Sequence, residues 1–137
     1  MRIVEAEDEL LSTIDITMQE AGNAFGNNKI YIEKFIENPR HIEVQIVGDG
    51  KGNAIHLGTR DCSMQRRHQK IIEEAPALDI DSQNLQNILD SCVNLCKEIN
   101  YEGVGTLEFL YEKKNFYFIE MNTCLLYTSD AADDCEG

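Results

Sequence analysis

Two strand-like apolar runs joined by a short polar turn constrain the fold of this chain more than any other feature. The runs VGTLEFLY (104–111) and FYFIEM (116–121) are rich in β-branched and aromatic residues, and Lys113-Lys114-Asn115 lies between them. This pattern is typical of a β-hairpin. A loop of those three residues would set three pairs opposite each other: Glu112 with Phe116, Leu110 with Phe118, and Glu108 with Glu120.

The expected pairing of Glu108 with Glu120 points to a metal ion. Directly opposed residues in an antiparallel pair have Cβ atoms about 4.5–5.5 Å apart and share a face of the sheet. Burying two carboxylates together is costly unless a cation compensates. Asn122 shares that face and offers an amide oxygen, and these three hard oxygen ligands suit Mg²⁺. The alternative is a solvent-exposed edge hairpin, because a slip of one residue in register would separate the pair.

Two helices are expected outside this hairpin. Apolar residues recur at helical spacing over about 7–24 and over about 82–100, with Ser82 as the N-cap of the second helix. Cys92 and Cys96 lie four residues apart in that helix among Leu and Ile residues. Core packing is therefore favoured over a disulfide or metal pair for these two thiols, since free Cys behaves as a small buried hydrophobe.

Further strands complete the predicted sheet. They are expected over three segments: 30–36, 41–47 and 54–58. The middle segment alternates cleanly and places Ile42, Val44 and Ile46 on its core face. Residues 60–74 are polar and basic, which favours an extended conformation. A hairpin-rich antiparallel sheet with flanking helices is an α+β fold.

A basic run stands out against the acidity of the chain. Four of the 12 Lys and Arg residues lie within RDCSMQRRHQK (60–70). In an extended segment, Arg66, His68 and Lys70 would share one face and form a positive strip suited to phosphate or bicarbonate. The alternative is a solvated basic face that balances the two glutamates at 73–74.

Composition excludes several classes of partner. The chain has 25 Asp and Glu against 12 Lys and Arg, and this balance disfavours nucleic acid or an anionic membrane as the main partner. No apolar run approaches the roughly 20 residues of a membrane span. The N-terminus lacks the basic start and apolar core of a signal peptide. The five cysteines form no disulfide or metal framework, so the sequence predicts a cytoplasmic protein.

Two stretches of the sequence resemble the biotin carboxylase family of ATP-grasp enzymes. One begins at IYIEKFIENPRHIEVQIVGDG (30–50) and continues through RDCSMQRRHQK to EEAP (73–76), and the other is VGTLEFLYEKKNFYFIEMNT (104–123). The RDCSMQRRHQK string followed by EEAP is specific to biotin-dependent carboxylases. Other ATP-grasp ligases, such as carbamoyl-phosphate synthetase, share the architecture but not that string. The resemblance covers about residues 1–123 and implies a partial ATP-grasp domain.

The resemblance implies a site for ATP and for magnesium or manganese. The positions that match the family's nucleotide-binding residues are Glu33, Lys34, Phe35, Ile36, His41, Gln65, His68, Leu110, Glu108 and Glu120. Those at 33–36 match the segment at the adenine edge, and Leu110 matches an apolar wall beneath the adenine. His41 matches a residue near the ribose, while Gln65 and His68 match groups on the nucleotide side of the site.

The metal and the acid substrate are implied at neighbouring positions. Glu108 and Glu120 match the two carboxylates that hold magnesium against the ATP phosphates, and Asn122 matches the adjacent metal ligand. Lys70 matches the lysine that binds bicarbonate and the carboxyphosphate intermediate, which makes it the expected catalytic residue. The implied reaction is the ATP-dependent carboxylation of biotin, in which bicarbonate attacks the γ-phosphate to form carboxyphosphate.

The family also implies the partners of the whole enzyme. They are a biotin carboxyl carrier protein that presents biotin as a carrier-bound substrate, bicarbonate, a carboxyltransferase component and, because the family is often dimeric, a second copy in a homodimer. An acetyl-CoA carboxylase that serves fatty acid biosynthesis is favoured as the parent. Pyruvate and propionyl-CoA carboxylases share these motifs and remain alternatives, and neither nucleic acid nor membrane is implied.

The chain departs from the family at both ends. The family's Gly-rich phosphate loop and its preceding lysine would come before Met1. The family continues after Thr123 with an arginine and soon a glutamate, but Cys124 takes the place of that arginine. Residues 124–137 resemble a translated sequencing adapter, with a divergent natural C-terminus as the alternative. We therefore expect a family-like part over 1–123 and a non-homologous tail over 124–137, and a fragment that is inactive alone or a non-catalytic nucleotide-binding remnant.

Overall fold

The computed structural model describes residues 2–67 and 69–123 of the chain. The chain divides into two units, residues 1–37 and residues 38–137, and each is described by itself. His68 and the tail 124–137 lie outside the described residues, so the predictions made for them receive no structural account.

The first unit consists of a short 3-10 helix, η1 (Glu7–Glu9), that leads into α1 (Leu10–Phe25), followed by a segment without regular structure. Gly26 ends α1 in the left-handed conformation, with φ 68°, and its N–H donates to the carbonyl of Gly22, as is common at helix C-termini. The helix was predicted over about 7–24 and is confirmed.

The strand predicted over 30–36 is wrong. Residues 27–36 form neither helix nor strand. Tyr31 and Ile32 keep 83% and 69% of their surface exposed, and no residue of this segment is fully buried within its unit. A strand needs a neighbour to satisfy its backbone groups, and no strand among the described residues 2–37 supplies one.

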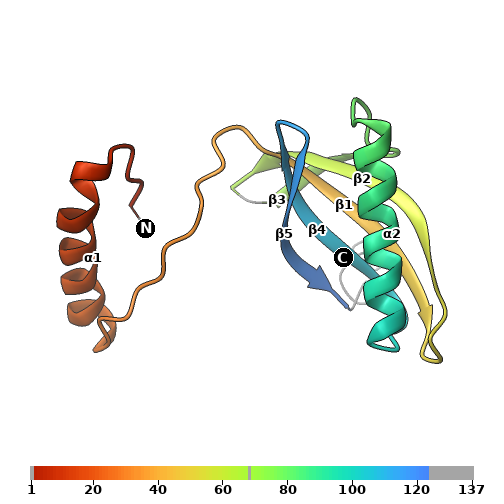
Figure 1. The fold of residues 1–137 in the computed structure, drawn as a ribbon, viewed down its shortest axis with the longest axis horizontal. Coiled ribbons are helices and arrows are strands. Elements are labelled where there is room, and N and C mark those ends of the chain that lie inside the picture. Colours follow the sequence, from red (N-terminus) through yellow and green to blue (C-terminus); the bar gives the residue numbers. More distant parts are fainter. Residues whose placement is uncertain (1, 68, 124–137) are drawn as a thin grey trace, which may run out of the picture. The chain divides into compact units, whose positions relative to one another are not determined.

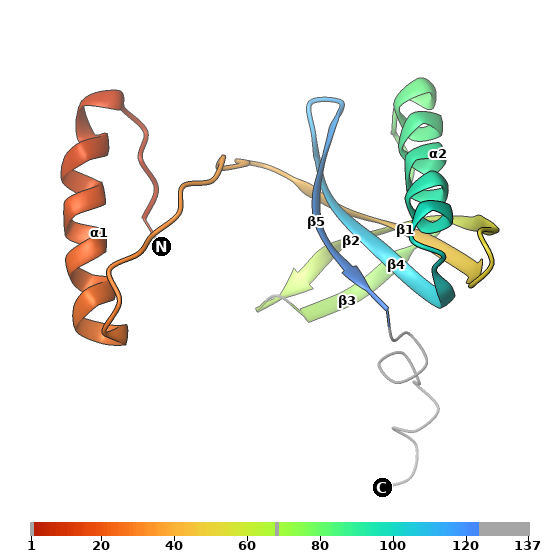
Figure 2. The same cartoon turned by 60° about the horizontal axis from the view of Figure 1, so that its bottom comes forward.

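The second unit is a five-stranded antiparallel sheet covered on one face by a helix (Figures 1 and 2). Its elements are β1 (Arg40–Asp49), β2 (Ala54–Arg66), β3 (Gln69–Glu74), α2 (Ser82–Glu98), β4 (Glu102–Glu112) and β5 (Asn115–Asn122). The strand order is β3-β2-β1-β4-β5, so α2 carries the chain from the β3 edge back to the centre of the sheet. The predicted α+β fold is confirmed. None of the helices in the described ranges is long and apolar enough to cross a bilayer.

The alternation of β1 separates the two faces of the sheet. Ile42, Val44 and Ile46 are fully buried, as predicted, and Val44 and Ile46 pack in one core with residues of α2, β2 and β4. Cys92 and Cys96 on α2 belong to that same core, which confirms their packing role. The residues between these apolar positions in β1 point to the opposite face.

The helix α2 begins differently from the prediction. Its N-cap is Asp81, whose carboxylate accepts a hydrogen bond from the backbone N–H of Asn84 at 3.2 Å. Ser82 is instead the first helical residue. Both Asp and Ser are good caps, so composition alone could not choose between adjacent candidates.

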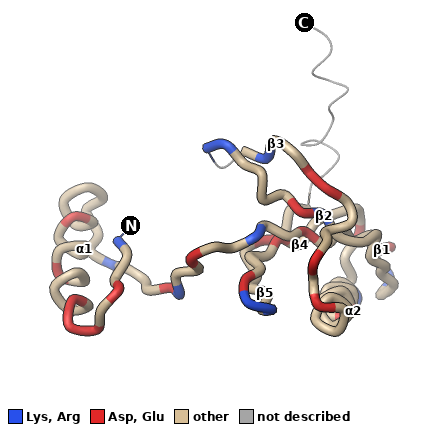
Figure 3. Tube along the Cα trace, turned by 90° about the horizontal axis from the view of Figure 1, so that it is seen from above, with Lys and Arg blue, Asp and Glu red and all other residues tan. Residues whose placement is uncertain are grey.

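The extended conformation predicted over 60–74 is confirmed in two strands, which fold back on each other as a hairpin. β2 and β3 form a hairpin that turns at Arg67, where φ is 53°, and basic residues gather at its tip (Figure 3). Lys70 pairs with Gln65 and Arg66 pairs with Gln69. Adjacent ladder positions point to opposite faces, so Arg66 does not share a face with Lys70 and the predicted strip is wrong for this pair.

The β4–β5 hairpin reaches the predicted carboxylate pairing by another route. Its loop contains only Lys113 and Lys114, with φ of 49° and 69°, so the register near the turn differs by one residue from the prediction. A β-bulge at Ile119 of β5 then shifts the register back by one residue, so Glu108 pairs with Glu120 as predicted. The other two predicted pairs are wrong, because the turn is shorter than expected.

Candidate functional site

The sheet face opposite α2 carries a group of charged side chains from four strands. The members are His41 and Glu43 of β1, Arg60 of β2, Lys70 of β3 and Glu108 of β4, and they are called the polar cluster below. Glu43 and Glu108 are neighbours on the β1–β4 ladder, and Glu43 and Arg60 are neighbours on the β1–β2 ladder. Pairing of the strands therefore assembles the polar cluster.

The ammonium of Lys70 bridges the two buried carboxylates. Its Nζ donates to Oε1 of Glu43 and, at 2.9 Å, to Oε1 of Glu108. The Glu43 and Glu108 side chains are 0% and 4% exposed, whereas Lys70 keeps 28%. The positive charge of this ammonium offsets the repulsion between the two buried carboxylates.

Glu43 is a member of the site that the sequence analysis missed. Its Oε2 accepts a hydrogen bond from Arg60 at 2.7 Å, and the other nitrogen of that guanidinium contacts Glu73. Glu43 stands between Ile42 and Val44 in a strand of alternating pattern, where a charged residue is normally expected to face solvent. The sequence did contain one indication that Glu43 belongs to the site: the alternation of β1 places it on the same face as His41, a predicted site residue.

His41 links Glu108 to Gln65. Its Nδ1 lies 2.9 Å from Nε2 of Gln65, and that amide also donates to the carbonyl of Cys62 at 2.9 Å. The Nε2 of His41 lies 2.7 Å from Oε2 of Glu108, but it is buried and makes no well-aligned hydrogen bond. Gln65 thus fixes the orientation of the His41 ring, which faces the buried carboxylate of Glu108.

The surroundings of Glu108 favour its ionised form. Burial acts to raise its pKa, but the hydrogen bond and charge of Lys70, together with His41, outweigh burial and hold the pKa below its usual value. Glu108 is therefore a carboxylate at neutral pH, which is the state in which it can bind a cation.

The expected metal ligands are adjacent on this face. Glu120 stands opposite Glu108, as predicted, but it is exposed on the edge strand β5, so the expected burial of both carboxylates together is wrong. Asn122 donates from Nδ2 to Oε1 of Glu108 at 2.6 Å, so its amide nitrogen faces that carboxylate. Potential ligand atoms of His41, Glu43 and Glu108 also lie within 4.8 Å of one another. Hard oxygen donors dominate this set, which fits Mg²⁺ or Mn²⁺, although Lys70 holds the place of a cation beside Glu108.

The remaining predicted site residues lie in different places. Leu110 pairs with His41 on the β1–β4 ladder and with Tyr117 of β5, and it lies two residues beyond Glu108 on the same face. Residues 33–36 belong to the first unit, where Glu33, Lys34 and Phe35 are exposed and Ile36 is half-buried. The structure thus brings together six predicted residues: His41, Gln65, Lys70, Glu108, Glu120 and Asn122.

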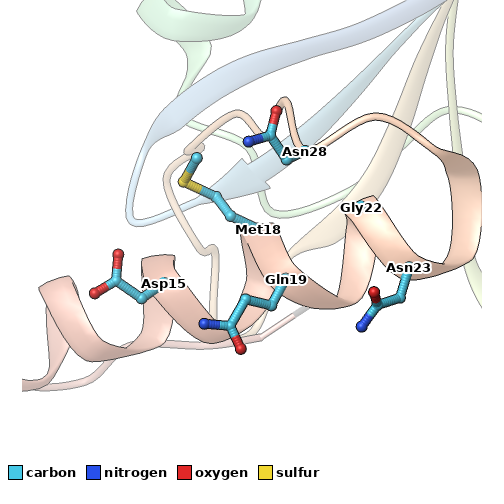
Figure 4. Close-up of a pocket in the computed structure, with 6 residues that line it drawn as sticks. All are labelled: Asp15, Met18, Gln19, Gly22, Asn23 and Asn28. Carbon is cyan, nitrogen blue, oxygen red and sulfur yellow. The ribbon is translucent and has the colours of Figure 1, made fainter.

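A shallow hollow beside α1 is a weaker candidate for a functional site than the polar cluster. Figure 4 shows its lining, which consists of Asp15, Met18, Gln19, Gly22, Asn23 and Asn28. A single carboxylate among amides and a thioether is a poor metal site, because such sites usually gather several charged oxygen ligands. The polar cluster is therefore the stronger candidate.

Comparison with known proteins gives one consistent result. A family model described as carbamoyl-phosphate synthase L chain, ATP binding domain, matches residues 1–137. A biotin carboxylase of Pseudomonas aeruginosa is 61% identical over 123 residues, which are 90% of this chain and 27% of that relative. A pyruvate carboxylase of Bacillus subtilis is 50% identical over 122 residues, which are 89% of this chain and 11% of that relative.

A solved structure also resembles this chain. The biotin carboxylase domain of a thermophilic 2-oxoglutarate carboxylase, bound to bicarbonate, matches with a TM-score of 0.83 and 48% identity over 89% of this chain and 28% of that chain. The sheet and its helices are thus those of part of a biotin carboxylase domain. The chain spans about a quarter of that domain's length and of the Pseudomonas relative.

Proposed function

The chain belongs to the family of the carbamoyl-phosphate synthase L chain ATP-binding domain and is a relative of the biotin carboxylases, and from this we propose that it is part of an enzyme that carboxylates biotin with ATP and bicarbonate. One observation carries the proposal. A lysine ammonium and a buried, ionised glutamate face each other at 2.9 Å on the polar face of the sheet, where an anion and a metal-bound nucleotide could meet.

The proposed reaction is a phosphoryl transfer followed by a carboxyl transfer. Bicarbonate attacks the γ-phosphate of ATP and forms carboxyphosphate with release of ADP. Carboxyphosphate then loses inorganic phosphate as its carboxyl group passes to the ureido nitrogen of biotin, whose proton is taken up by that phosphate. Such chemistry depends on positioning and on neutralising the charge that develops on the phosphoryl oxygens. A magnesium ion, when bound, would supply part of that positive charge.

We assign the roles as follows. Lys70 binds bicarbonate and stabilises carboxyphosphate, since an ammonium attracts a small anion. Glu108, Glu120 and Asn122 hold the metal ion. Gln65 orients His41, which contacts the nucleotide near the ribose, and the hydrogen bond between the two side chains supports this pairing.

We further propose that the remaining nucleotide contacts come from the positions predicted for them. These are the adenine-edge residues Glu33, Lys34, Phe35 and Ile36, the apolar wall Leu110, and His68, which lies outside the described part of the chain. Their support is the family resemblance of the segments that contain them.

We also propose a parent enzyme and its partners. Relatives include biotin carboxylases as well as a pyruvate carboxylase. We favour the biotin carboxylase of an acetyl-CoA carboxylase in fatty acid biosynthesis, acting as a homodimer with a biotin carboxyl carrier protein and a carboxyltransferase component. A cytoplasmic location is supported by the thiols of Cys62, Cys92 and Cys96, which are buried and unpaired, as is usual in a reducing compartment.

We also propose that residues 1–123 are the enzyme-like part and that residues 124–137 are foreign to it. A match of 123 residues with the Pseudomonas relative is consistent with this division, whereas the family model extends over residues 1–137. Resequencing the gene from untagged genomic DNA tests it. Recovery of an arginine codon in place of Cys124 would support the proposal, and recovery of the same tail would refute it.

A chimaeric enzyme tests the function. In it, residues 1–123 of this chain replace the matching segment of the Pseudomonas biotin carboxylase, which supplies the rest of the protein. We expect ATP cleavage that depends on bicarbonate, magnesium and free biotin. A folded chimaera that cleaves no ATP under these conditions would refute the proposal that this segment supports carboxylation.

The metal assignment has its own test in the chimaera. Glu120→Gln removes a proposed ligand charge and should lower magnesium-dependent turnover by about a hundredfold, as expected when a charged group stabilises the transition state. Glu98→Gln is the matched control, because Glu98 is exposed at the end of α2, and its turnover should be unchanged. Near-normal activity of Glu120→Gln would remove Glu120 from the metal site.

A further inference from the structure

Glu43 is the least exposed member of the polar cluster, with 0% of its side chain exposed. A buried carboxylate is tolerated only when hydrogen bonds and opposite charge compensate its lost hydration. Here Arg60 and Lys70 both donate to it, one to each carboxylate oxygen. The charged groups around it are completed by His41, Glu73 and Glu108.

The two cations hold Glu43 in different ways. Arg60 is its direct neighbour on the β1–β2 ladder and has a second carboxylate, Glu73. Lys70 comes from β3, at the far side of β2. Its long side chain must reach past β2 to meet Glu43 on β1, and past β2 and β1 to meet Glu108 on β4. A lysine side chain has large rotamer freedom, so this reach persists only while an acceptor holds the ammonium.

Metal binding at the proposed site would affect the two acceptors of Lys70, Glu43 and Glu108, differently. Glu108 is an expected metal ligand, and a carboxylate oxygen that binds a metal ion is a poorer acceptor for an ammonium. Glu43 lies deeper and is not needed for the metal set of Glu108, Glu120 and Asn122. It is therefore the acceptor that can keep Lys70 on this face.

We infer that Glu43 is a positioning residue for Lys70. Its carboxylate fixes the ammonium over the polar face, so that N–H donors released from Glu108 are aimed at a small oxyanion such as bicarbonate. An ammonium has three donors, so one anchoring bond leaves two for the anion. This inference rests on the proposed binding of bicarbonate by Lys70, and it adds a residue that never touches the substrate.

The first test measures Michaelis constants in the chimaera. Glu43→Gln keeps the size of the side chain and removes its charge, and we expect the KM for bicarbonate to rise about tenfold, the scale of one lost charge-assisted hydrogen bond. The KM for ATP should change less than about twofold. Asp61→Asn is the matched control, because it breaks the ion pair of Asp61 with Arg40 at 2.7 Å outside the polar cluster and should leave the KM for bicarbonate unchanged.

A double-mutant cycle separates positioning from general structural damage. In a Lys70→Gln background, Glu43→Gln should raise the KM for bicarbonate no further, because the group that it positions is gone. Equal effects of Glu43→Gln with and without Lys70, or an unchanged KM in the single variant, would overturn the inference. If Glu43→Gln fails to fold, Glu43→Asp keeps the charge for Arg60, shortens the reach to Lys70, and should give the same selective rise.

A second readout requires no activity. In the full chain labelled with ¹⁵N-lysine and carrying Glu108→Gln, which removes the other charged acceptor of Lys70, the Lys70 ammonium should exchange protons with water slowly enough to be observed by NMR, and adding Glu43→Gln should abolish that signal. Persistence of the signal in the variant would refute the anchoring role of Glu43. The two failures are distinguishable: a chimaera without bicarbonate-dependent ATP cleavage refutes the proposed function, whereas an active chimaera with unchanged KM in Glu43→Gln refutes only this inference.

Discussion

Replacing Lys70 with methionine removes the cation between two buried carboxylates and keeps most of the side-chain volume. Glu43 and Glu108 are 0% and 4% exposed, so neither regains hydration when the ammonium is lost. Loss of one partner from a fully buried pair costs about 3–5 kcal/mol. Here we expect about 2–3 kcal/mol, because the Lys70 side chain is 28% exposed and Arg60 still compensates Glu43.

The pH dependence identifies the cause of that loss. In the folded chain the pKa of Glu108 lies below its usual value. Glu108 therefore stabilises the fold above its unfolded pKa of about 4.3, and this stabilisation is lost as the pH falls through its folded pKa. Without Lys70, burial would instead raise the pKa of Glu108, and protonation at low pH would relieve the variant. The difference in free energy of unfolding should thus be largest near neutral pH and shrink towards about pH 4.

Urea denaturation of the full chain, followed by circular dichroism at about pH 7.5 and about pH 4.5, measures this difference. Lys97→Met is the control, because Lys97 is an exposed residue in the last turn of α2, and its effect should stay within about 0.5 kcal/mol. An equal destabilisation of Lys70→Met at both pH values would refute the electrostatic explanation. The loss would then belong to the packing of the lysine methylenes.

Three further outcomes test the fold. Asp81→Ala should destabilise the chain by about 1 kcal/mol through loss of the α2 N-cap, whereas Ser82→Ala should have little effect; the reverse order in thermal denaturation would restore the serine as the cap. Gly48→Ala should cost more than about 2 kcal/mol in urea denaturation, because its Cβ would lie 2.1 Å from the carbonyl oxygen of Tyr101. Burial raises the pKa of the Cys92 thiol to about 12, so iodoacetamide should modify it only after denaturation, and rapid labelling of the native chain would contradict its place in the core.

The spacing of apolar residues along the sequence correctly predicted β1 and α2, whose buried faces repeat regularly. The alternation of Ile42, Val44 and Ile46 was enough to identify the core face of β1, because period-two burial is a property of the strand itself. The helical spacing of Cys92 and Cys96 was equally informative for α2. The segment 30–36 has a similar strand-like pattern, yet forms no strand among the described residues, since pairing depends on a neighbour that a local pattern does not specify.

The carboxylate pairing was predicted correctly for a partly wrong reason. The loop has two residues instead of three, and the added Ile119 on β5 compensates, so Glu108 and Glu120 still pair. Turn length and bulges depend on backbone conformation, here two successive lysines with positive φ, which residue type alone did not indicate. The nucleotide, metal and bicarbonate roles stay predictions, because geometry brings residues together without assigning their ligands.

The polar cluster explains why Glu43 escaped detection and why it matters. A glutamate in an apolar strand is expected to face solvent as long as the strand order is unknown. The cations that compensate Glu43 lie 17 and 27 residues away in sequence, on β2 and β3. Once the sheet forms, Glu43 and Glu108 balance Arg60 and Lys70. A metal ion at Glu108 and Glu120 would disturb that balance in favour of positive charge. Under the proposed function, the incoming anions, a nucleotide and bicarbonate, would restore it, and metal binding would then be coupled to the capture of both substrates.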